Sequence, residues 1–132
     1  MYKRQHLACL TDVPVDSLDL TDLPRVDPAL FPEGVNVEVV NVLAAEDAPD
    51  GAHAAIRLRV YERGVGETRS CGTGACAAAF AALQAGGRTA GTVAVDVPGG
   101  RLSVEFDGRT TVLSGPAVVV ASGVLTAEWL GG

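Results

Sequence analysis

The sequence has few aromatic residues, few cysteines and little positive charge. Aromatic residues make up 5% of its 132 residues, so valine, alanine and leucine must build the core. Three cysteines, an odd number in so short a chain, argue against a disulfide framework and favour a reducing cytoplasm. The formal net charge of -6 argues against nucleic-acid binding and against adhesion to an anionic membrane. No apolar run approaches the roughly 20 residues that a membrane-spanning helix needs.

Hydrophobic patterning indicates a folded α+β chain. Alternation over residues 35–42 and 54–61 predicts two strands, with Ile56, Leu58 and Val60 on the buried face of the second. Residues 73–85 are apolar, uncharged and followed by two glycines, which predicts a helix buried on most of its surface. Further strands are expected at 6–10, 92–97, 101–106, 109–113, 117–121 and 124–130. The prediction is a curved, mostly antiparallel sheet wrapped around one central apolar helix.

The beginning of the chain and its first long connection are less regular. Residues 1–5 are polar and basic, unlike the apolar segment that begins at His6, and we expect a truncated or non-native start there. Prolines and aspartates recur over residues 11–34, which predicts an irregular connection with at most one or two short helical turns. Residues 6–132 are expected to form a single domain.

Cys71 is the residue whose surroundings point most clearly to chemistry. It precedes Gly-Thr-Gly and an alanine-rich segment, so the thiol should lie where a loop becomes a helix. A helix N-terminus favours an anion, which could be a thiolate or a bound carboxylate. A structural cysteine inside a core would not need glycine neighbours, although Gly-Thr-Gly by itself also occurs at ordinary turns.

Two charged residues precede this thiol and suggest a ligand for it. Arg63 is suited to bidentate binding of a carboxylate, and Glu62 could pair with an ammonium group. The backbone amides of Gly72 and Thr73, at the start of the helix, could hold a second carboxylate. The combination predicts an amino acid as ligand. The alternative is that Glu62 and Arg63 form an exposed pair that contributes little.

A thiolate beside an amino acid could act as a nucleophile or remove a proton. Hydrolysis normally needs a histidine base, and neither His6 nor His53 has an evident route to Cys71, so proton abstraction is favoured. Both histidines are interpreted as structural or surface residues. Cys9 and Cys76 are interpreted as core residues, and no spacing of ligands indicates a metal site.

Two segments together resemble the carboxyl-terminal half of diaminopimelate epimerase, namely ERGVGETRSCGTGACAAAFAAL and, upstream, FPEGVNVEVV. The Glu-Arg pair, the Cys-Gly-Thr-Gly helix start and the Val-Asn-Val segment occur in the order that this family shows. The resemblance runs from about residue 6 to the end of the chain and covers about half of the enzyme.

The resemblance implies an isomerase of lysine and peptidoglycan biosynthesis in the cytoplasm. The family interconverts LL- and meso-diaminopimelate without pyridoxal phosphate or a metal, by means of two cysteines on opposite faces of the substrate α-carbon. Cys71 matches the second of these cysteines. Five further residues match substrate-binding positions: Asn36, Glu62, Arg63, Gly72 and Thr73. The implied enzyme has two similar α+β domains with the active site between them.

The differences from the family suggest that this chain is only part of the enzyme. The partner cysteine belongs to a missing N-terminal domain, so the chain alone is expected to be inactive. Arg4 and Gln5 replace the asparagine and proline that usually precede the equivalent of His6, as a false start would. The strand over 124–130 is expected to pack on the missing domain, and its exposed edge would otherwise favour aggregation or a homodimer.

Two alternatives stay open at this point. One is another cofactor-independent racemase or isomerase of the same superfamily, although the Glu-Arg loop with Gly-Thr-Gly favours the diaminopimelate branch. The other is a non-catalytic module that binds carboxylates, for which an unreactive Cys71 would be typical.

Overall fold

A computed structural model of the chain describes residues 5–131, so most of the predicted irregular start, residues 1–4, lies outside the described residues. The strands are β1 (His6–Leu10), β2 (Asn36–Val42), β3 (Ala54–Glu62), β4 (Gly66–Thr68), β5 (Gly91–Val97), β6 (Gly100–Phe106) and β7 (Thr111–Ser114). The helices are α1 (Gly72–Ala85) and α2 (Ala127–Leu130), with two 3-10 turns, η1 (Val15–Ser17) and η2 (Ala45–Asp47).

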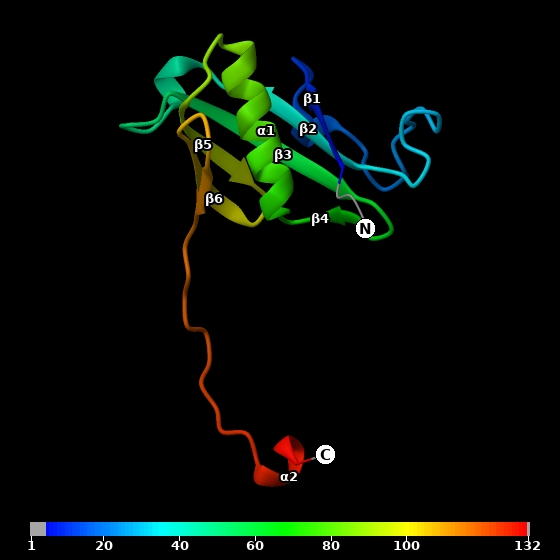
Figure 1. The fold of residues 1–132 in the computed structure, drawn as a ribbon, viewed down its shortest axis with the longest axis vertical. Coiled ribbons are helices and arrows are strands. Elements are labelled where there is room, and N and C mark those ends of the chain that lie inside the picture. Colours follow the sequence, from blue (N-terminus) through cyan, green and yellow to red (C-terminus); the bar gives the residue numbers. More distant parts are fainter. Residues whose placement is uncertain (1–4, 132) are drawn as a thin grey trace.

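All seven strands belong to one mixed sheet. Its order is β1-β2-β3-β5-β6-β7, and β4 pairs with β3 at the side. The β1–β2 and β3–β5 pairs are parallel, and the other pairs are antiparallel. Helix α1 lies across one face (Figure 1) and contacts both edge strands, β1 and β7, so the sheet curves around it. The predicted α+β architecture is confirmed.

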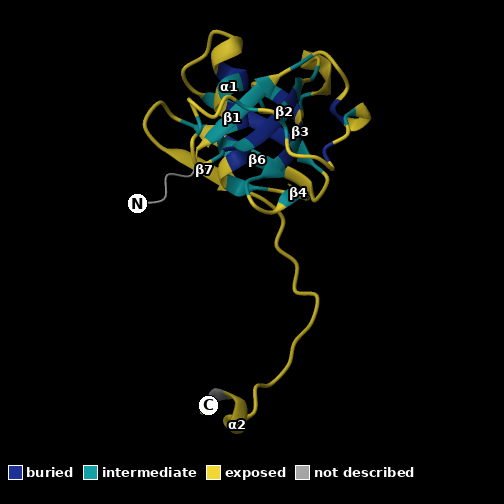
Figure 2. Cartoon of the chain, turned by 90° about the vertical axis from the view of Figure 1, so that its right-hand side faces the viewer, coloured by how far each residue is buried: buried dark blue, intermediate teal, exposed yellow. Residues whose placement is uncertain are grey.

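The core lies between this face of the sheet and α1. In β3 the residues predicted to be buried are fully enclosed, with Ile56 and Leu58 0% exposed and Val60 1% exposed. Figure 2 shows the buried residues, in dark blue, gathered in the central strands and on part of α1. The helix buries one stripe, made of Gly74, Ala75, Ala78, Ala79, Ala82 and Leu83.

The prediction that α1 is buried on most of its surface is right only in part: six of its 14 residues are buried, four are half-buried and four are exposed. Phe80, on the other side of the helix, is 44% exposed and packs edge to face with Phe106, with the ring centroids 5.2 Å apart. Alanine explains the error, because it is uncharged and small enough to lie on either the buried or the exposed face of a helix.

Residues 11–35 cover part of the opposite face of the sheet, as the predicted irregular connection. The carboxamide of Asn41 on β2 holds this segment: its Oδ1 accepts a hydrogen bond from the Val15 N–H (2.8 Å), and its Nδ2 donates to the carbonyls of Thr11 (2.7 Å) and Val13 (2.8 Å). The guanidinium of Arg59 on β3 donates to the Val15 carbonyl at 2.6 Å. Hydrogen bonds with two half-buried polar side chains thus hold this segment, which contains no strand or α-helix.

The last part of the chain departs most from the prediction. Residues 115–126 contain no helix or strand and extend away from the sheet (Figures 1 and 2), and residues 127–130 form α2. The strands predicted at 117–121 and 124–130 are therefore wrong for the chain as described. Valine favours a strand only beside a neighbouring strand, and Val119 and Val120 are 88% and 92% exposed. Among residues 5–131, no helix has the length and apolar character that would cross a membrane.

We predict that Leu58→Ala lowers the free energy of unfolding by about 2–5 kcal/mol, because it leaves a cavity in the enclosed core. Leu23→Ala is the matched control, since Leu23 is 64% exposed and should change stability little. Urea unfolding followed by circular dichroism measures both variants. Equal losses in the two variants would contradict the assignment of the core.

Candidate active site

Cys71 is the residue immediately before α1. Its carbonyl accepts the hydrogen bond of the Ala75 N–H at 2.8 Å, which closes the first turn of the helix. Its side chain is half-buried, and the Sγ atom lies 3.6 Å from the Thr73 Oγ1. The predicted position, at the point where a loop becomes a helix, is confirmed.

The predicted site residues come together around this thiol. A pocket of about 230 Å³ is lined by Asn36, Glu62, Arg63, Cys71 and Thr73. These residues come from the start of β2, the end of β3 and the start of α1. The sixth predicted residue, Gly72, does not line the pocket; a Cβ atom there would lie 3.1 Å from the Leu113 Cδ2 on β7. The structure thus places these residues side by side, while their roles toward a ligand stay predictions.

Short polar contacts fix the position of Arg63 beside the pocket. The Asn36 Oδ1 accepts a hydrogen bond from the Arg63 N–H at 2.9 Å, so the amide nitrogen of Asn36 is its donor end for a ligand. The Arg63 Nη1 donates to the Glu33 carbonyl at 2.9 Å. Gly34 has a positive φ of 75° and a Cβ there would lie 3.0 Å from the Arg63 Cδ, so a side chain at this position would displace the arginine.

The short strand β4, which the sequence analysis did not predict, supports the glutamate of the pocket. The Thr68 hydroxyl donates to the Glu62 Oε1 at 2.6 Å. One residue earlier, Glu67 accepts two hydrogen bonds from Arg59 at 2.7 and 2.9 Å, and this contact lowers the pKa of Glu67. The loop that leads to Cys71 is therefore tied to β3 at two successive residues.

His6 also lies beside Cys71, which corrects the expectation that it has no route to the thiol. The Cys71 Sγ lies within 4.8 Å of a ring nitrogen of His6 and of a carboxylate oxygen of Glu38. The His6 Nδ1 and the Glu38 Oε1 are 2.6 Å apart. The only sequence signal was a carboxylate inside a strand with no other charged residue, in Val-Glu-Val. His53 has the structural role that was predicted, since its Nδ1 accepts the Thr92 N–H at 3.0 Å.

Glu38 lies between the sheet and α1. Its side chain is 0% exposed, and a Cβ atom at Gly74 would lie only 2.6 Å from the Glu38 Oε1. Burial raises the pKa of Glu38, and the hydrogen bond with His6 partly offsets that rise. The space that Gly74 opens on this face of the helix is thus occupied by a carboxylate of the protein itself.

Glu38, His6 and Cys71 form the one group of potential metal ligands found among residues 5–131. Structural zinc sites normally use four ligands, and catalytic sites use three with a water. Here the His6 and Glu38 atoms are already hydrogen-bonded to each other. We therefore assign no metal to this group.

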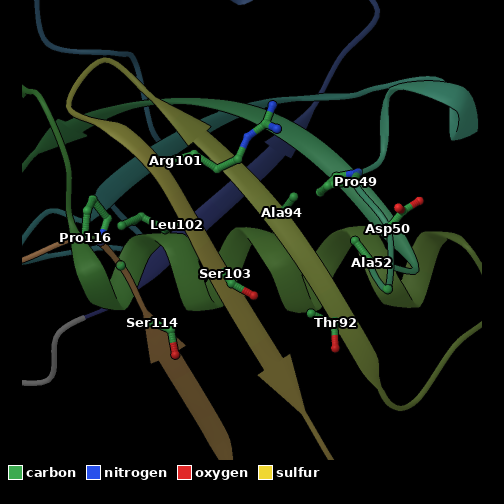
Figure 3. A pocket seen from close by; sticks show the side chains of 12 residues that line it. Pro49, Asp50, Ala52, Thr92, Ala94, Arg101, Leu102, Ser103, Ser114 and Pro116 are labelled. Atoms are coloured by element: carbon green, nitrogen blue, oxygen red, sulfur yellow. The ribbon is translucent and has the colours of Figure 1, made fainter.

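A larger cavity lies elsewhere in the described residues. It has a volume of about 470 Å³ and is lined by residues of β5 and β6, including Thr92, Ala94, Arg101 and Ser103. Figure 3 shows these side chains on the face of the sheet that points away from α1. None of the predicted site residues lines this cavity.

Comparison with known proteins identifies the family. The family model described as diaminopimelate epimerase matches residues 11–120, which is most of the chain. The chain belongs to the diaminopimelate epimerase family. The matched range includes Asn36, Glu62, Arg63 and Cys71, and it begins after His6.

Individual diaminopimelate epimerases are similar over nearly the whole chain. The enzyme of Rhodococcus opacus (strain B4) is 47% identical over 131 residues, and that of Mycobacterium ulcerans (strain Agy99) is 48% identical over 128 residues. These alignments cover 96% and 94% of this chain but 43% and 41% of the relatives. The chain thus spans about two fifths of the length of the curated epimerases that it matches.

We predict that Gly74→Ala destabilises the protein by about 1–3 kcal/mol, because the new methyl group collides with a fully buried carboxylate. The sign of the change in stability identifies the close contact, since Gly→Ala inside a helix normally stabilises a protein by about 0.5–1 kcal/mol. Gly86→Ala is the control, because its nearest contact would be an ordinary 3.5 Å. Urea unfolding measures both variants, and a stabilised Gly74→Ala protein would contradict the close contact.

We also predict that iodoacetamide alkylates Cys71 before the other two cysteines at neutral pH. Burial raises the pKa of Cys9 and Cys76, which keeps both protonated, whereas Cys71 lines a pocket. Peptide mass spectrometry over time gives the three rates. Faster labelling of Cys76 than of Cys71 would contradict the prediction.

Proposed function

We propose that this chain is the carboxyl-terminal half of an amino-acid epimerase that interconverts LL- and meso-diaminopimelate. In this proposal, Cys71 is one of two cysteines that transfer a proton at the substrate α-carbon. The observation that carries it is the pocket in which Cys71 lies beside Arg63, Glu62, Asn36 and Thr73. Membership of the family supports the same substrate.

The pocket offers complementary groups for both charges of an amino acid. The guanidinium of Arg63 and the amide nitrogen of Asn36 donate hydrogen bonds to the carboxylate. The carboxylate of Glu62, already oriented by Thr68, accepts from the ammonium group. The N–H groups of Gly72 and Thr73 belong to the first turn of α1, where the helix dipole stabilises negative charge.

Proton transfer follows from the position of the sulfur. As the thiolate, Cys71 takes the α-proton: the C–H bond breaks, an S–H bond forms, and the electron pair passes to the α-carbon and its carboxylate. Inversion then requires a proton from the opposite face. In this proposal a thiol of an N-terminal domain, absent from the chain, donates it. No cofactor is needed, because the thiolate itself is the base.

The extended carboxyl-terminal segment, residues 115–126, fits the same proposal. Residues 124–130, which overlap its end, are the ones expected to pack as a strand on the N-terminal domain, and the exposed valines Val118, Val119 and Val120 would extend that contact. Residues 6–114 with this segment would then be one epimerase-like domain and its crossing strand. The alternative to contact with an N-terminal domain is that the same valines pair with a second copy of this chain and form a homodimer. The proposed site of action is the cytoplasm, in lysine and peptidoglycan biosynthesis.

Another cofactor-independent racemase activity is the competing proposal, and a panel of substrates separates the two. Diaminopimelate carries a second amino-acid group at its far end, whereas a substrate such as proline does not. We expect tighter binding of diaminopimelate than of proline in calorimetry.

We predict that the chain alone produces no meso-diaminopimelate from the LL isomer in deuterated water. With one proton-transfer group in place, any deuterium should enter the α-position with retained configuration. Chiral chromatography and NMR detect the two outcomes.

The Cys71→Ser variant should lose this exchange, and Cys76→Ser should keep it, because Cys76 packs against the core outside the pocket. Formation of the meso isomer by the chain alone would refute the proposed half-enzyme. Exchange that survives in Cys71→Ser would remove Cys71 from its proposed role.

A further inference from the structure

Glu38 is the one charged side chain among the described residues that is fully buried. It lies in β2, next to β1 in a parallel pair in which Ala8 is opposite Glu38 and His6 is opposite Asn36. A buried carboxylate is costly to desolvate and contributes little net stability even when paired. Glu38 is the one charged residue of β2, and its presence there therefore calls for an explanation other than packing.

The contacts of Glu38 lead to the site. Its Oε1 lies 2.6 Å from the Nδ1 of His6, and the backbone N–H groups of Leu7 and Glu38 also interact favourably with the carboxylate, lowering its pKa against the effect of burial. Helix α1 approaches it at Gly74, in the first turn, where the dipole favours a negative charge. Burial outweighs these contacts and leaves the pKa of Glu38 raised, whereas the contact with His6 works in the other direction and favours the ionised carboxylate as its acceptor.

The other ring nitrogen of His6 has no such partner. The Nε2 atom is buried and makes no hydrogen bond with any residue in the range 5–131. The Sγ of Cys71 lies within 4.8 Å of a ring nitrogen of the same histidine. Strand β2, strand β1 and the start of α1 thus bring a carboxylate, an imidazole and a thiol together, with one atom of each within 4.8 Å of the other two.

We propose that Glu38 is a positioning residue of the active site, which holds His6 as the Nδ1–H tautomer so that Nε2 exchanges a proton with Cys71. In the forward step, the S–H bond of Cys71 breaks and an N–H bond forms at Nε2. The products are a thiolate and an imidazolium, and the carboxylate of Glu38 faces the imidazolium across the 2.6 Å contact. This inference rests on the proposed role of Cys71.

The charge balance explains why a carboxylate is needed. An imidazolium formed in a buried site would lack compensation without an adjacent negative charge, and the orienting carboxylate of a catalytic triad meets the same requirement. The titratable groups that face Glu38 are His6 and Cys9 from β1, and Cys71 at the start of α1 lies near it. Burial and the charge of Glu38 raise the pKa of Cys9, which leaves Cys9 as a neutral neighbour.

The chain contains its own control for the tautomer, because it has two histidines. The Nδ1 of His53 accepts a hydrogen bond from the Thr92 N–H, so His53 must carry its proton on Nε2 when neutral. We expect nitrogen-15 NMR of the wild-type chain above pH 7 to show opposite tautomers, with Nδ1–H at His6 and Nε2–H at His53. An Nε2–H tautomer at His6 overturns the proposal.

Variants test whether Glu38 acts through His6. In Glu38→Gln, whose side chain has the same shape, the Nδ1–H preference of His6 should be lost and alkylation of Cys71 at neutral pH should slow at least about 10-fold. Glu105→Gln, which removes an exposed carboxylate from β6, should change neither. Unchanged His6 signals and Cys71 rates in Glu38→Gln overturn the proposal.

A double-mutant cycle separates positioning from a general structural effect. His6→Gln should slow Cys71 alkylation, and His6→Gln with Glu38→Gln should be no slower than His6→Gln alone. Additive losses would overturn the proposal. If Glu38→Gln does not fold, the tautomer of His6 in the wild-type chain and the rate of Cys71 alkylation in His6→Gln still test the proposal. Deuterium exchange at the diaminopimelate α-carbon is a separate measurement. Failure of the proposed epimerase function is therefore distinguishable from failure of the proposed role of Glu38.

Discussion

The contact between a buried carboxylate and the first turn of a helix determines how this molecule is assembled. Glu38 fills the space that Gly74 leaves open, so it sets the distance between β2 and α1. Cys71 lies three residues before Gly74, and His6 reaches the same carboxylate from β1. The relative positions of the thiol and the imidazole therefore depend on one contact between the sheet and the helix.

On the other side of the pocket, hydrogen bonds between strand ends hold Arg63 and Glu62 in place. Asn36 bonds the backbone of Arg63, and Thr68 bonds the carboxylate of Glu62. Both contacts join the ends of strands that are already paired in the sheet. The pocket is thus preorganised within residues 33–73, because these contacts and the bond of Arg63 to the Glu33 carbonyl all lie within that range. A ligand would meet polar groups whose orientation is already fixed.

The sequence predicted well those features that depend on neighbouring residues. Alternation identified β2 and β3, and the contiguous segment from Glu62 to Thr73 contained most of the pocket. Asn36 was found only through the resemblance to the epimerases. The pairing of His6 with Glu38 was missed, because it joins residues 32 positions apart and depends on the strand order. Strand propensity failed at residues 117–121, where the valines have no neighbouring strand among the described residues.

The place of β1 in the sheet has a consequence for how the site can lose its order. Among residues 5–131 this strand is at the edge of the sheet and pairs only with β2, so its ladder can open at lower cost than the central strands. Such fraying would withdraw the imidazole from the sulfur while β3, β5 and α1 stay folded. Any polypeptide that bound along the free edge of β1 would suppress this opening. The chemical competence of the thiol would then respond to what is bound along an edge of the sheet.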